Sequence, residues 1–459
     1  MGAQDKDMQE PLGQSYYQNL LKTDKVPPPK TLLNPSTDDT LGTGDIPAER
    51  YFSQAFHDLE VEKVWKKVWQ VACWGEDIPN PGDVYVYDLA DISVLVIRQE
   101  DGSLKAFHNS CLHRGRQLMD KTGHAKALRC PYHSFTWNLD GSFKHLPSAW
   151  DFPQIDEKNF GLPEVRVEMW NGFAFINLDP QAPPLMEYLE GMPQQWAEWD
   201  MTKRFKSAHV IKHMPANWKA VLEAFIEAFH ADSTHPQMVP FSGIEQSQYD
   251  VWPGQKHYSR AITPMGMIST AAKQKLSEQE IVDGFIRGYL PNAVIGSPEA
   301  TVPPGGTARE VIGRLYAESV GKMFNVDVSQ LSIADALDGV WYYVFPNFEP
   351  WPTLGYPLFY RFRPYGNNPD ESLMDIMILS PFEGERPPSA ATVYQGMNDG
   401  SRLENVLGPL GAVLDQDVDN MQALQRGLKA SVRKGLVMSK YQESRIRHYH
   451  RTLTEYINR

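Results

Sequence analysis

The sequence is poor in cysteine and in positive charge. Its 459 residues include three cysteines, Cys73, Cys111 and Cys130. So small and odd a number makes a poor disulfide framework and is typical of a reducing compartment, so we expect a cytoplasmic protein. Lysine and arginine number 44 against 57 aspartate and glutamate residues, which gives a formal net charge of −13. This balance argues against a protein that binds nucleic acid or anionic membranes, because both classes need a basic surface.

Long apolar runs are also missing from the sequence. No run approaches the roughly 20 apolar residues that a membrane-spanning helix requires. The N-terminal stretch lacks the basic and apolar regions of a secretory signal, so we expect neither secretion nor a membrane span. With 42% hydrophobic and 22% charged residues, the composition is typical of a globular protein, and the length favours two domains.

The first part of the chain changes character twice. Residues 1–45 are polar and rich in proline, with no sustained period, so we expect an extended or partly disordered arm. Residues 52–70 place apolar side chains among charges at helical spacing, which predicts a helix. Short β-rich runs separated by turns then follow as far as residue 179. Because such runs are typical of a small β-sandwich, we assign residues 46–178 to an N-terminal domain.

The rest of the chain mixes helix and strand. Residues 217–231 carry apolar side chains at every third or fourth position, which predicts a helix. Further helices are expected at 270–290, 308–324, 403–429 and 440–458, and strands at 341–345, 358–364 and 372–382. We therefore predict an α+β protein in which residues 179–459 form a second and larger domain.

Two matched pairs of metal-binding residues lie in the first domain, Cys111-x-His113 and Cys130-x-x-His133. Four unrelated core residues and a structural zinc site are the competing interpretations. Zinc sites with two cysteines and two histidines usually keep both cysteines in one pair. Here each pair holds one cysteine and one histidine. That arrangement suits a [2Fe–2S] cluster in which one iron takes both thiolates and the other takes both imidazoles.

The sequence around these pairs resembles the Rieske signature. C-L-H-R-G, and later C-P-Y-H-S-F-T-W-N-L-D-G, match the two ligand loops of that fold and the hairpin that follows them. The resemblance implies that Cys111 and Cys130 are the thiolate ligands of a Rieske [2Fe–2S] cluster. It also implies that His113 and His133 are the imidazole ligands.

A second pair of histidines, His230 and His235, lies at the end of the predicted helix. Such a pair taken alone is more often structural than metal-binding. Five residues of ideal helix turn the chain by about 140°, so both rings can face one point only if the helix loosens. Pro236 makes that loosening plausible. A non-haem Fe(II) oxygenase site needs two histidines and one carboxylate with positions left open for dioxygen.

The segment N-W-K-A-V-L-E-A-F-I-E-A-F-H-A-D-S-T-H-P is similar to the stretch of Rieske non-haem iron oxygenases that carries two iron-binding histidines. Residues 414–428 are similar to the helix that carries the third ligand in that family. The resemblance implies that His230, His235 and Asp417 bind one Fe(II), with Asp415 as the reserve for the carboxylate. An acidic helix start favoured by the helix dipole is the alternative explanation of these aspartates.

Glu227 lies three residues before the first of these histidines. In the family an acidic residue at this position, usually aspartate, joins the two metal centres through hydrogen bonds. The resemblance implies the same role for Glu227, although glutamate is one methylene longer. A solvated helix carboxylate is the alternative.

The resemblance covers the chain from about residue 50 onward and implies the alpha subunit of an aromatic ring-hydroxylating oxygenase. Its fold would be a Rieske domain followed by a helix-grip domain, an antiparallel sheet wrapped on a long helix. Electrons would come from NAD(P)H through a separate reductase or ferredoxin, since the sequence has no dinucleotide-binding G-x-G-x-x-G motif. The resemblance implies a homotrimer, with or without a beta subunit. The enzyme would use O2 to hydroxylate an apolar, aromatic or polycyclic small molecule, either by ring dihydroxylation or by monooxygenation or demethylation.

An electron carrier is the competing function: a Rieske protein with a ligand-binding domain and no catalytic iron. The set His230, His235 and Asp417 separates the two hypotheses, because a carrier does not need it. The candidate pocket residues are apolar and flank the iron-binding segments. They are Phe225, Met238, Val239, Phe241, Trp341, Tyr343 and Phe345.

Overall fold

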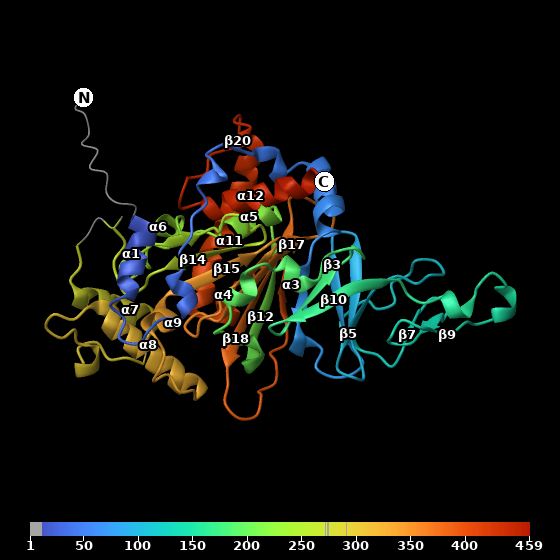
Figure 1. Ribbon diagram of the computed structural model, residues 1–459, viewed down its shortest axis with the longest axis horizontal. Helices are drawn as coiled ribbons and strands as arrows, with labels where there is room; N and C mark the ends of the chain where they lie inside the picture. Colours follow the sequence, from blue (N-terminus) through green and yellow to red (C-terminus); the bar gives the residue numbers. More distant parts are fainter. Residues whose placement is uncertain (1–11, 271, 273–274, 291) are drawn as a thin grey trace.

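The computed structural model describes residues 12–270, 272, 275–290 and 292–459. Figure 1 shows a β-rich region, built from the strands between β2 and β11, beside a larger region of sheet and helices. The two regions follow each other in the sequence, and strands and helices occur in separate blocks. The predicted α+β class is therefore confirmed.

The N-terminal region is built on a seven-stranded antiparallel sheet of order β2-β11-β10-β5-β4-β3-β6. Its strands are β2 (Gln70–Trp74), β3 (Asp83–Leu89), β4 (Ile92–Arg98), β5 (Leu104–His108), β6 (Gly123–His124), β10 (Glu164–Trp170) and β11 (Phe173–Asn177). A tight turn joins β4 to β5, and Gly102 has φ +81° there, a conformation that glycine adopts without strain. The short strands and turns read from the sequence are thus present.

A small three-stranded sheet projects from this region at one end of the molecule (Figure 1). It consists of β7 (Leu128–Arg129), β8 (Thr136–Trp137) and β9 (Phe143–His145). Trp137 on β8 is fully buried, and its indole Nε1 donates to the carbonyl oxygen of Phe160 at 2.8 Å. Phe135 and Leu128 are buried in the same cluster. This local core gives the loops around the small sheet a fixed base.

An eight-stranded sheet forms the centre of the second region, in the order β13-β14-β15-β16-β17-β18-β12-β19. All neighbours pair antiparallel except β12 and β19. The strands are β12 (Arg204–Met214), β13 (Gln248–Asp250), β14 (Tyr258–Thr263), β15 (Gly339–Val344), β16 (Phe348–Pro350), β17 (Leu358–Pro364), β18 (Ser372–Pro381) and β19 (Val393–Gln395). Strands β15 to β17 are buried throughout, so both faces of the sheet are covered here.

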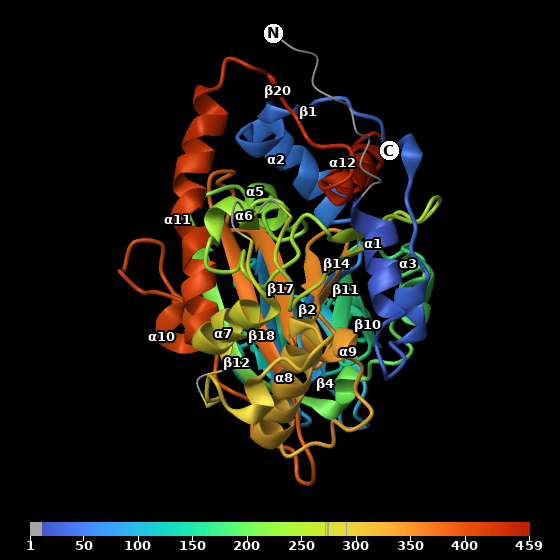
Figure 2. The same cartoon turned by 90° about the vertical axis from the view of Figure 1, so that its left-hand side faces the viewer.

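Helices surround this sheet. They include α5 (Trp218–Glu223), α7 (Glu278–Tyr289), α8 (Ala308–Phe324), α11 (Pro409–Ala430) and α12 (Ser444–Ile457). Figure 2 shows the 22-residue α11 running along the sheet beside β12 and β18. Other short elements are α2 (Gln54–Glu60), α3 (Leu185–Tyr188), α4 (Met192–Gln195), α6 (Ala231–Thr234), α9 (Ile333–Leu337), α10 (Glu404–Leu407), β1 (Ile46–Pro47) and β20 (Gly435–Leu436). A mostly antiparallel sheet with a long helix against it is the helix-grip arrangement that the resemblance implied.

Capping residues define where two of these helices begin. Ser277 and Glu280 form a reciprocal capping box at the start of α7, and Thr307 and Glu310 form another at the start of α8. Helix α7 therefore begins at Glu278 rather than near residue 270. None of the helices in the described ranges has the length and apolar character needed to cross a bilayer.

Buried arginines connect the two regions. Arg361 on β17 donates to the backbone carbonyl of Val71 on β2 at 3.1 Å, and Arg363 donates to that of Asp88 on β3 at 2.6 Å. Both guanidinium groups are paired with the fully buried Asp375 on β18. Because these charges satisfy one another, the arginines can bind the neighbouring region without leaving an unpaired charge inside the protein.

Residues 12–45 differ from the extended arm expected from the sequence. They begin with helix α1 (Leu12–Leu21) and continue with short 3-10 turns against the second region. Tyr17 is fully buried, and its hydroxyl donates to Asp338 at 2.8 Å. Apolar side chains spaced among the polar ones provide this anchoring, a pattern too short to distinguish from a loop in the sequence. Residues 1–11 lie outside the described part.

Candidate metal centres and substrate cavity

Two loops carry the predicted cluster residues, one after β5 and one after β7. In each loop the cysteine N–H donates to the carbonyl five residues on, from Cys111 to Arg116 and from Cys130 to Phe135, both at 2.8 Å. The carbonyl oxygen of Cys111 also accepts the N–H of Gly115, and that of Cys130 accepts the N–H of Ser134, each four residues further along the chain. The two loops are thus built alike, with Gly115 and Ser134 both at positive φ.

The four predicted ligands converge at the tips of these loops. The centroids of the imidazole rings of His113 and His133 lie 4.6 Å apart, and both Cys111 and Cys130 are buried. The Nδ1 atoms of both histidines are buried without a hydrogen-bond partner. Such orphaned nitrogens are rare in folded proteins and call for a ligand. Two thiols and two free imidazole nitrogens form the donor set that a Rieske [2Fe–2S] cluster requires, so the residues fit that group.

Aromatic and exposed side chains surround this site. Phe135 stacks on the His113 ring at 4.6 Å, which holds the ring in place. Tyr132, next to His133, remains 56% exposed, and Arg114 lies over its ring. Phe152 contacts the His113 ring edge-on, and Trp150 two residues earlier is 83% exposed. An exposed aromatic surface beside a redox site is a typical place for a protein partner to dock.

The segment that carries the second pair of histidines is not one helix. Helix α5 ends at Glu223, turns occupy residues 224–230, and α6 is a single turn between His230 and His235. The prediction of a continuous helix over 217–231 was therefore wrong in its second half. The break turns both imidazole rings to one side, which an ideal helix would not allow for residues five apart.

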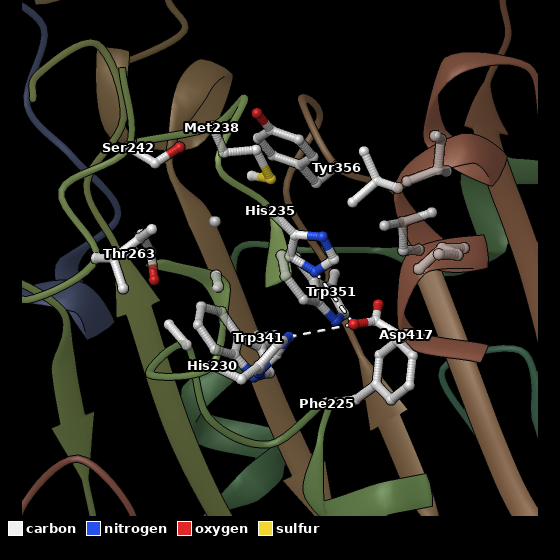
Figure 3. Close-up of a pocket in the computed structure, with 18 of the residues that line it drawn as sticks. Phe225, His230, His235, Met238, Ser242, Thr263, Trp341, Trp351, Tyr356 and Asp417 are labelled. Carbon is white, nitrogen blue, oxygen red and sulfur yellow. Dashed lines mark ion pairs between the residues drawn. The ribbon is translucent and has the colours of Figure 1, made fainter. Parts of the chain in front are cut away.

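His230, His235 and Asp417 meet at one point (Figure 3). The Nε2 atoms of His230 and His235 lie 3.4 and 3.1 Å from the same Asp417 oxygen, Oδ1. Helix α11 supplies Asp417, and the α6 turn supplies both histidines. One ligand atom from each residue lies within 4.8 Å of the others, close enough to hold a metal ion. Two histidines and one carboxylate on one side of an ion are the ligand set of non-haem Fe(II) oxygenases, so these residues fit that metal.

Hydrogen bonds orient both histidines. The Nδ1 atom of His230 lies 2.7 Å from Glu227, and that of His235 lies 2.8 Å from the amide oxygen of Gln416. Gln237 donates to the same oxygen of Gln416 at 2.7 Å. Because each Nδ1 donates its hydrogen, each Nε2 is free to bind a metal. Gln416 and Gln237 were not predicted from the sequence, because a glutamine next to a ligand carries no distinctive pattern.

Asp415, the reserve for the carboxylate ligand, has a different environment. Its two oxygens accept the backbone N–H groups of Leu403 and Glu404 at 2.9 and 3.1 Å, and so cap helix α10. Asp417 lies two residues on, about half a helical turn away, and faces the histidines instead. The geometry therefore favours Asp417 as the ligand and gives Asp415 a structural role.

Charge at the three-residue site follows from this geometry. Burial alone would lower the pKa of His230, but hydrogen bonds to Asp417 and Glu227 outweigh it and raise the pKa to about 10. Burial opposes ionisation of Asp417, yet the two histidines lower its pKa overall. Without a metal the site thus holds a proton between a carboxylate and an imidazole. A divalent cation can replace that proton.

Glu227 stands at the boundary between two hollows. Its two oxygens bind the ring and the backbone N–H of His230, and its side chain is largely buried. On one side lies a cavity of about 160 Å³ that reaches His230 and Asp417, and on the other lies one of about 500 Å³ that borders the same residues and Glu223. Glu227 is therefore not a solvated helix carboxylate, which was the alternative interpretation of this residue from the sequence.

The smaller cavity is predominantly apolar and aromatic (Figure 3). Beside the three candidate ligands and Glu227, its walls include Phe225, Met238, Ser242, Ile244, Thr263, Met265, Tyr289, Trp341, Trp351, Tyr356, Leu358, Tyr360, Leu410, Val413 and Leu414. Phe225, Met238 and Trp341 were among the predicted pocket residues. A deep apolar cavity with a few polar groups is a typical small-molecule site.

Four of the predicted pocket residues lie elsewhere. Val239 and Phe241 pack into neighbouring core clusters. Tyr343 and Phe345 follow Trp341 along the same side of the chain, but helix α12 covers them, with its tyrosines 5.4 to 6.0 Å away. Alternation along a strand identifies a face, and only the tertiary structure decides which end of that face stays open.

Several wall residues were absent from the sequence prediction. Leu358 and Tyr360 alternate on β17, so the strand pattern could have suggested them once one of the pair was known. Trp351 and Tyr356 lie in the connection before β17, where no periodicity exists. Their position depends on the path of the loop, which the sequence does not encode locally.

The fold and the two candidate sites define a class of protein: Rieske non-haem iron oxygenases, in which an iron–sulfur domain accompanies a domain with a two-histidine, one-carboxylate iron site. The chain belongs to the ring hydroxylating alpha subunit family, whose catalytic-domain model matches residues 197–459. The model of the Rieske [2Fe-2S] domain matches residues 68–156, within the predicted first domain of 46–178. The boundaries of the predicted domains themselves stay predictions.

Relatives in sequence are oxygenase subunits. The carnitine monooxygenase oxygenase subunit of Escherichia coli (strain K12) is 32% identical over 194 residues, which cover 42% of this chain and 52% of that protein. The large oxygenase component of the naphthalene 1,2-dioxygenase system of Pseudomonas putida is 34% identical over 189 residues, 38% of this chain and 41% of that protein. The matches thus span about half the length of these relatives.

Solved structures resemble the chain over nearly its whole length. A quaternary ammonium Rieske monooxygenase superposes with a TM-score of 0.64 at 18% identity, covering 92% of this chain and 99% of that one. Naphthalene 1,2-dioxygenase bound to indole gives a TM-score of 0.61 at 18% identity, covering 92% and 94%. At this identity the likeness establishes the fold.

Proposed function

We propose that this chain is the terminal oxygenase component of a multicomponent Rieske oxygenase, and that it inserts oxygen into a small aromatic molecule. The observation that carries the proposal is the position of His230, His235 and Asp417, whose metal-binding atoms converge at the wall of an apolar, aromatic cavity. A metal site with no access to a ligand cavity would serve structure or electron storage. Here metal site and cavity share their wall, as an oxygenase requires.

Each group of residues has a role in this proposal. Cys111, Cys130, His113 and His133 would hold the [2Fe–2S] cluster, which receives electrons from a ferredoxin or reductase and ultimately from NAD(P)H. His230, His235 and Asp417 would hold one Fe(II), which when bound supplies the activation of dioxygen. Glu227 and Gln416 keep each histidine in the tautomer that presents Nε2. The aromatic walls bind the substrate and exclude water.

The cavity limits the size of the substrate. An apolar cavity of roughly 150 Å³ is large enough to bind a benzene molecule. This cavity measures about 160 Å³, so a one-ring aromatic molecule fits without movement of the walls. Larger polycyclic molecules, which the resemblance to the family also implied, require a side chain such as Met238 to change rotamer.

The relatives named for carnitine and glycine betaine make quaternary ammonium compounds the second candidate substrates. The faces of Trp341 and Trp351 would attract such a cation. Carnitine and glycine betaine also carry a carboxylate, however, and a buried carboxylate needs a cationic partner. Among the described residues that line the cavity there is no lysine or arginine. We therefore favour the neutral aromatic substrate.

Electron transfer in this proposal runs between subunits of a homotrimer. A carboxylate that links two imidazoles must reach a ring nitrogen of each, within about 3 Å. Glu227 already binds His230 and borders the larger cavity, where the exposed cluster tip of a neighbouring chain could bring its His133. A head-to-tail contact of this kind closes into a ring. A beta subunit is compatible with the same ring.

Product analysis tests the proposed function. The full chain, loaded with iron and given a surrogate ferredoxin, reductase and NADH, should convert toluene or another one-ring aromatic in the presence of labelled dioxygen. We expect label from dioxygen in the product, and a much lower rate with glycine betaine. NADH oxidation without any labelled organic product would support the alternative of an electron carrier. A faster reaction with glycine betaine would favour the second substrate class.

A further inference from the structure

Two tryptophans form a flat wall of the substrate cavity. The rings of Trp341 on β15 and Trp351 after β16 are stacked, with centroids 4.6 Å apart and planes 10° from parallel. Gly339 allows this approach, because a Cβ at that position would lie 3.2 Å from the Trp351 ring and 3.6 Å from the Trp341 ring. Both indoles line the cavity that His230 also borders (Figure 3). A rigid aromatic surface next to the metal-binding residues would set the plane of a flat ligand.

Buried groups hold this pair from behind. Glu349 on β16 is fully buried, and its Oε1 accepts the indole N–H of Trp351 at 3.1 Å. Arg445 on α12 is also fully buried, with its guanidinium 5.6 Å from the centroid of the Trp341 ring. Burial raises the pKa of Glu349 well above its ordinary value, although the guanidinium of Arg445 opposes that shift. Neither residue lines the cavity, so neither contacts a ligand directly.

Arg445 also connects the wall to the metal-binding segment. Its Nη1 donates to the carbonyl oxygen of Ile226 at 3.0 Å, in the turn that leads to Glu227 and His230. Its Nε donates to the hydroxyl of Ser259 on β14 at 3.1 Å. One side chain therefore fixes the distance between the aromatic wall and the segment of the first histidine.

We propose that Glu349 and Arg445 are positioning residues that determine which carbon of the substrate is oxygenated. They act by fixing the Trp341–Trp351 wall relative to His230. This inference rests on the proposed function for the identity of the reaction, but the fixed wall itself is a property of the resting protein. It places the control of regiochemistry on two residues that never touch the substrate, one of them on the last helix of the chain.

The test compares Glu349→Met with Glu349→Gln in the full, metal-loaded chain. Methionine keeps the volume but removes the acceptor, whereas glutamine keeps an acceptor for the Trp351 indole. Near-ultraviolet circular dichroism of the resting protein reports the stacked indoles, and the ratio of ring to methyl oxygenation of toluene reports the reaction. We expect Glu349→Met to weaken the dichroism and change the product ratio by about fivefold, the effect of one lost hydrogen bond. Glu349→Gln should stay close to wild type.

Additional variants separate positioning from general damage. Trp351→Phe removes both the indole donor and part of the wall itself, so it should change the product ratio at least as much as Glu349→Met does. Arg445→Lys, which keeps the charge but loses the fork geometry, should also shift the ratio. Trp252→Phe is the control, since Trp252 stacks on Tyr258 outside the cavity and should leave the ratio unchanged.

The outcomes distinguish this inference from the proposed function. If Glu349→Met leaves the dichroism and the product ratio unchanged, or if Glu349→Gln behaves like Glu349→Met, the positioning role is overturned. If the dichroism changes as expected and no form of the protein yields an oxygenated product, the fixed wall stands and the proposed function fails.

Discussion

The two candidate metal centres are built in opposite ways. The cluster residues lie on two similar loops, one after β5 of the seven-stranded sheet and one after β7 of the small three-stranded sheet, and Tyr132 between the second pair of ligands is exposed. The iron-binding residues come from distant parts of the chain, and His235 and Asp417 are buried. This difference matches two tasks. A site that receives electrons from another protein must be accessible, whereas a site that activates oxygen must exclude water.

Removing a cluster thiolate should have the largest effect, because it should eliminate one metal centre and leave the other in place. Cys111→Ser should abolish the visible absorbance of the oxidised protein and all product formation, because thiolate-to-iron charge transfer gives the cluster its colour. The mononuclear iron should remain, since the two centres share no residues. Absorption spectra and iron analysis of the purified variant measure both.

Cys73→Ser is the matched control. Cys73 is buried on β2, and burial raises its pKa, so it remains a neutral thiol packed in the core. The spectrum of this variant should equal that of the wild type. Unchanged colour in Cys111→Ser would show that the cluster assignment is wrong.

Removing the carboxylate ligand should affect the second centre alone. Asp417→Ala should lose the mononuclear iron, so the iron content falls from three atoms per chain to the two of the cluster. The Rieske spectrum should persist and product formation should become undetectable. Asp415→Ala serves as the comparison: it removes the cap of α10 and should cost about 1 kcal/mol of stability while keeping the iron. Loss of iron from Asp415→Ala and its retention in Asp417→Ala would reverse the assignment.

The same contrast explains how much the sequence could predict. The cluster site is local, so spacing and loop sequence were sufficient to predict four residues that the structure brings onto two neighbouring loops. The two histidines needed a break in a helix that periodicity predicted as continuous to residue 231; the resemblance, rather than the pattern, identified them. Asp417 could be chosen over Asp415 only by resemblance, and the cap of α10 now gives the physical reason.

The cavity walls were harder to predict than either centre. Trp341 was identified, but its partner Trp351 lies in a loop whose path depends on the whole sheet. Tyr343 was expected beside Trp341, and helix α12 covers it instead. Most of the fold followed from alternation and helical spacing. The side-chain environment of the cavity depends on how distant elements pack, which a single sequence does not show.

Glu227 links the two metal centres in the proposed electron route. Changing it should therefore affect the transfer of electrons between the centres without removing either metal. Glu227→Gln should keep both metals and the oligomer, because an amide can still hydrogen-bond to His230. We expect transfer from the reduced cluster to the iron site to slow by about 10- to 100-fold, the usual effect of altering a partner of a metal-bound histidine. Single-turnover kinetics of the reduced protein measure this rate.

Gln416→Met provides the parallel change at the other histidine. It removes the partner of His235 and should weaken iron retention, with little effect on transfer when iron is saturating. Wild-type speed in Glu227→Gln, or an active monomer of the unaltered chain, would exclude the inter-subunit route.

The smallest expected effect concerns the approach of the electron donor. Around the cluster, residues 111–145 hold six basic residues against two aspartates, a local charge of +4 in a protein of −13. In the structure Arg116 is paired with Asp120 at 2.6 Å, so the attraction rests on the exposed Arg114, Lys121, Lys126, Arg129 and Lys144.

These cations should attract an acidic ferredoxin, and salt weakens such attraction because the Debye length is about 10 Å at 0.1 M ionic strength. The second-order rate of cluster reduction by the donor should therefore fall as salt rises, and Lys126→Glu should lower the rate several-fold at low salt and hardly at all at high salt. Lys322→Glu on α8, an exposed residue remote from the cluster, makes the same charge change and should have little effect. Equal effects of the two reversals, or a rate indifferent to salt, would mean that the basic surface does not guide the donor. The exposed aromatic tip would then account for docking alone, and the cluster region would differ from the iron region in access but not in charge.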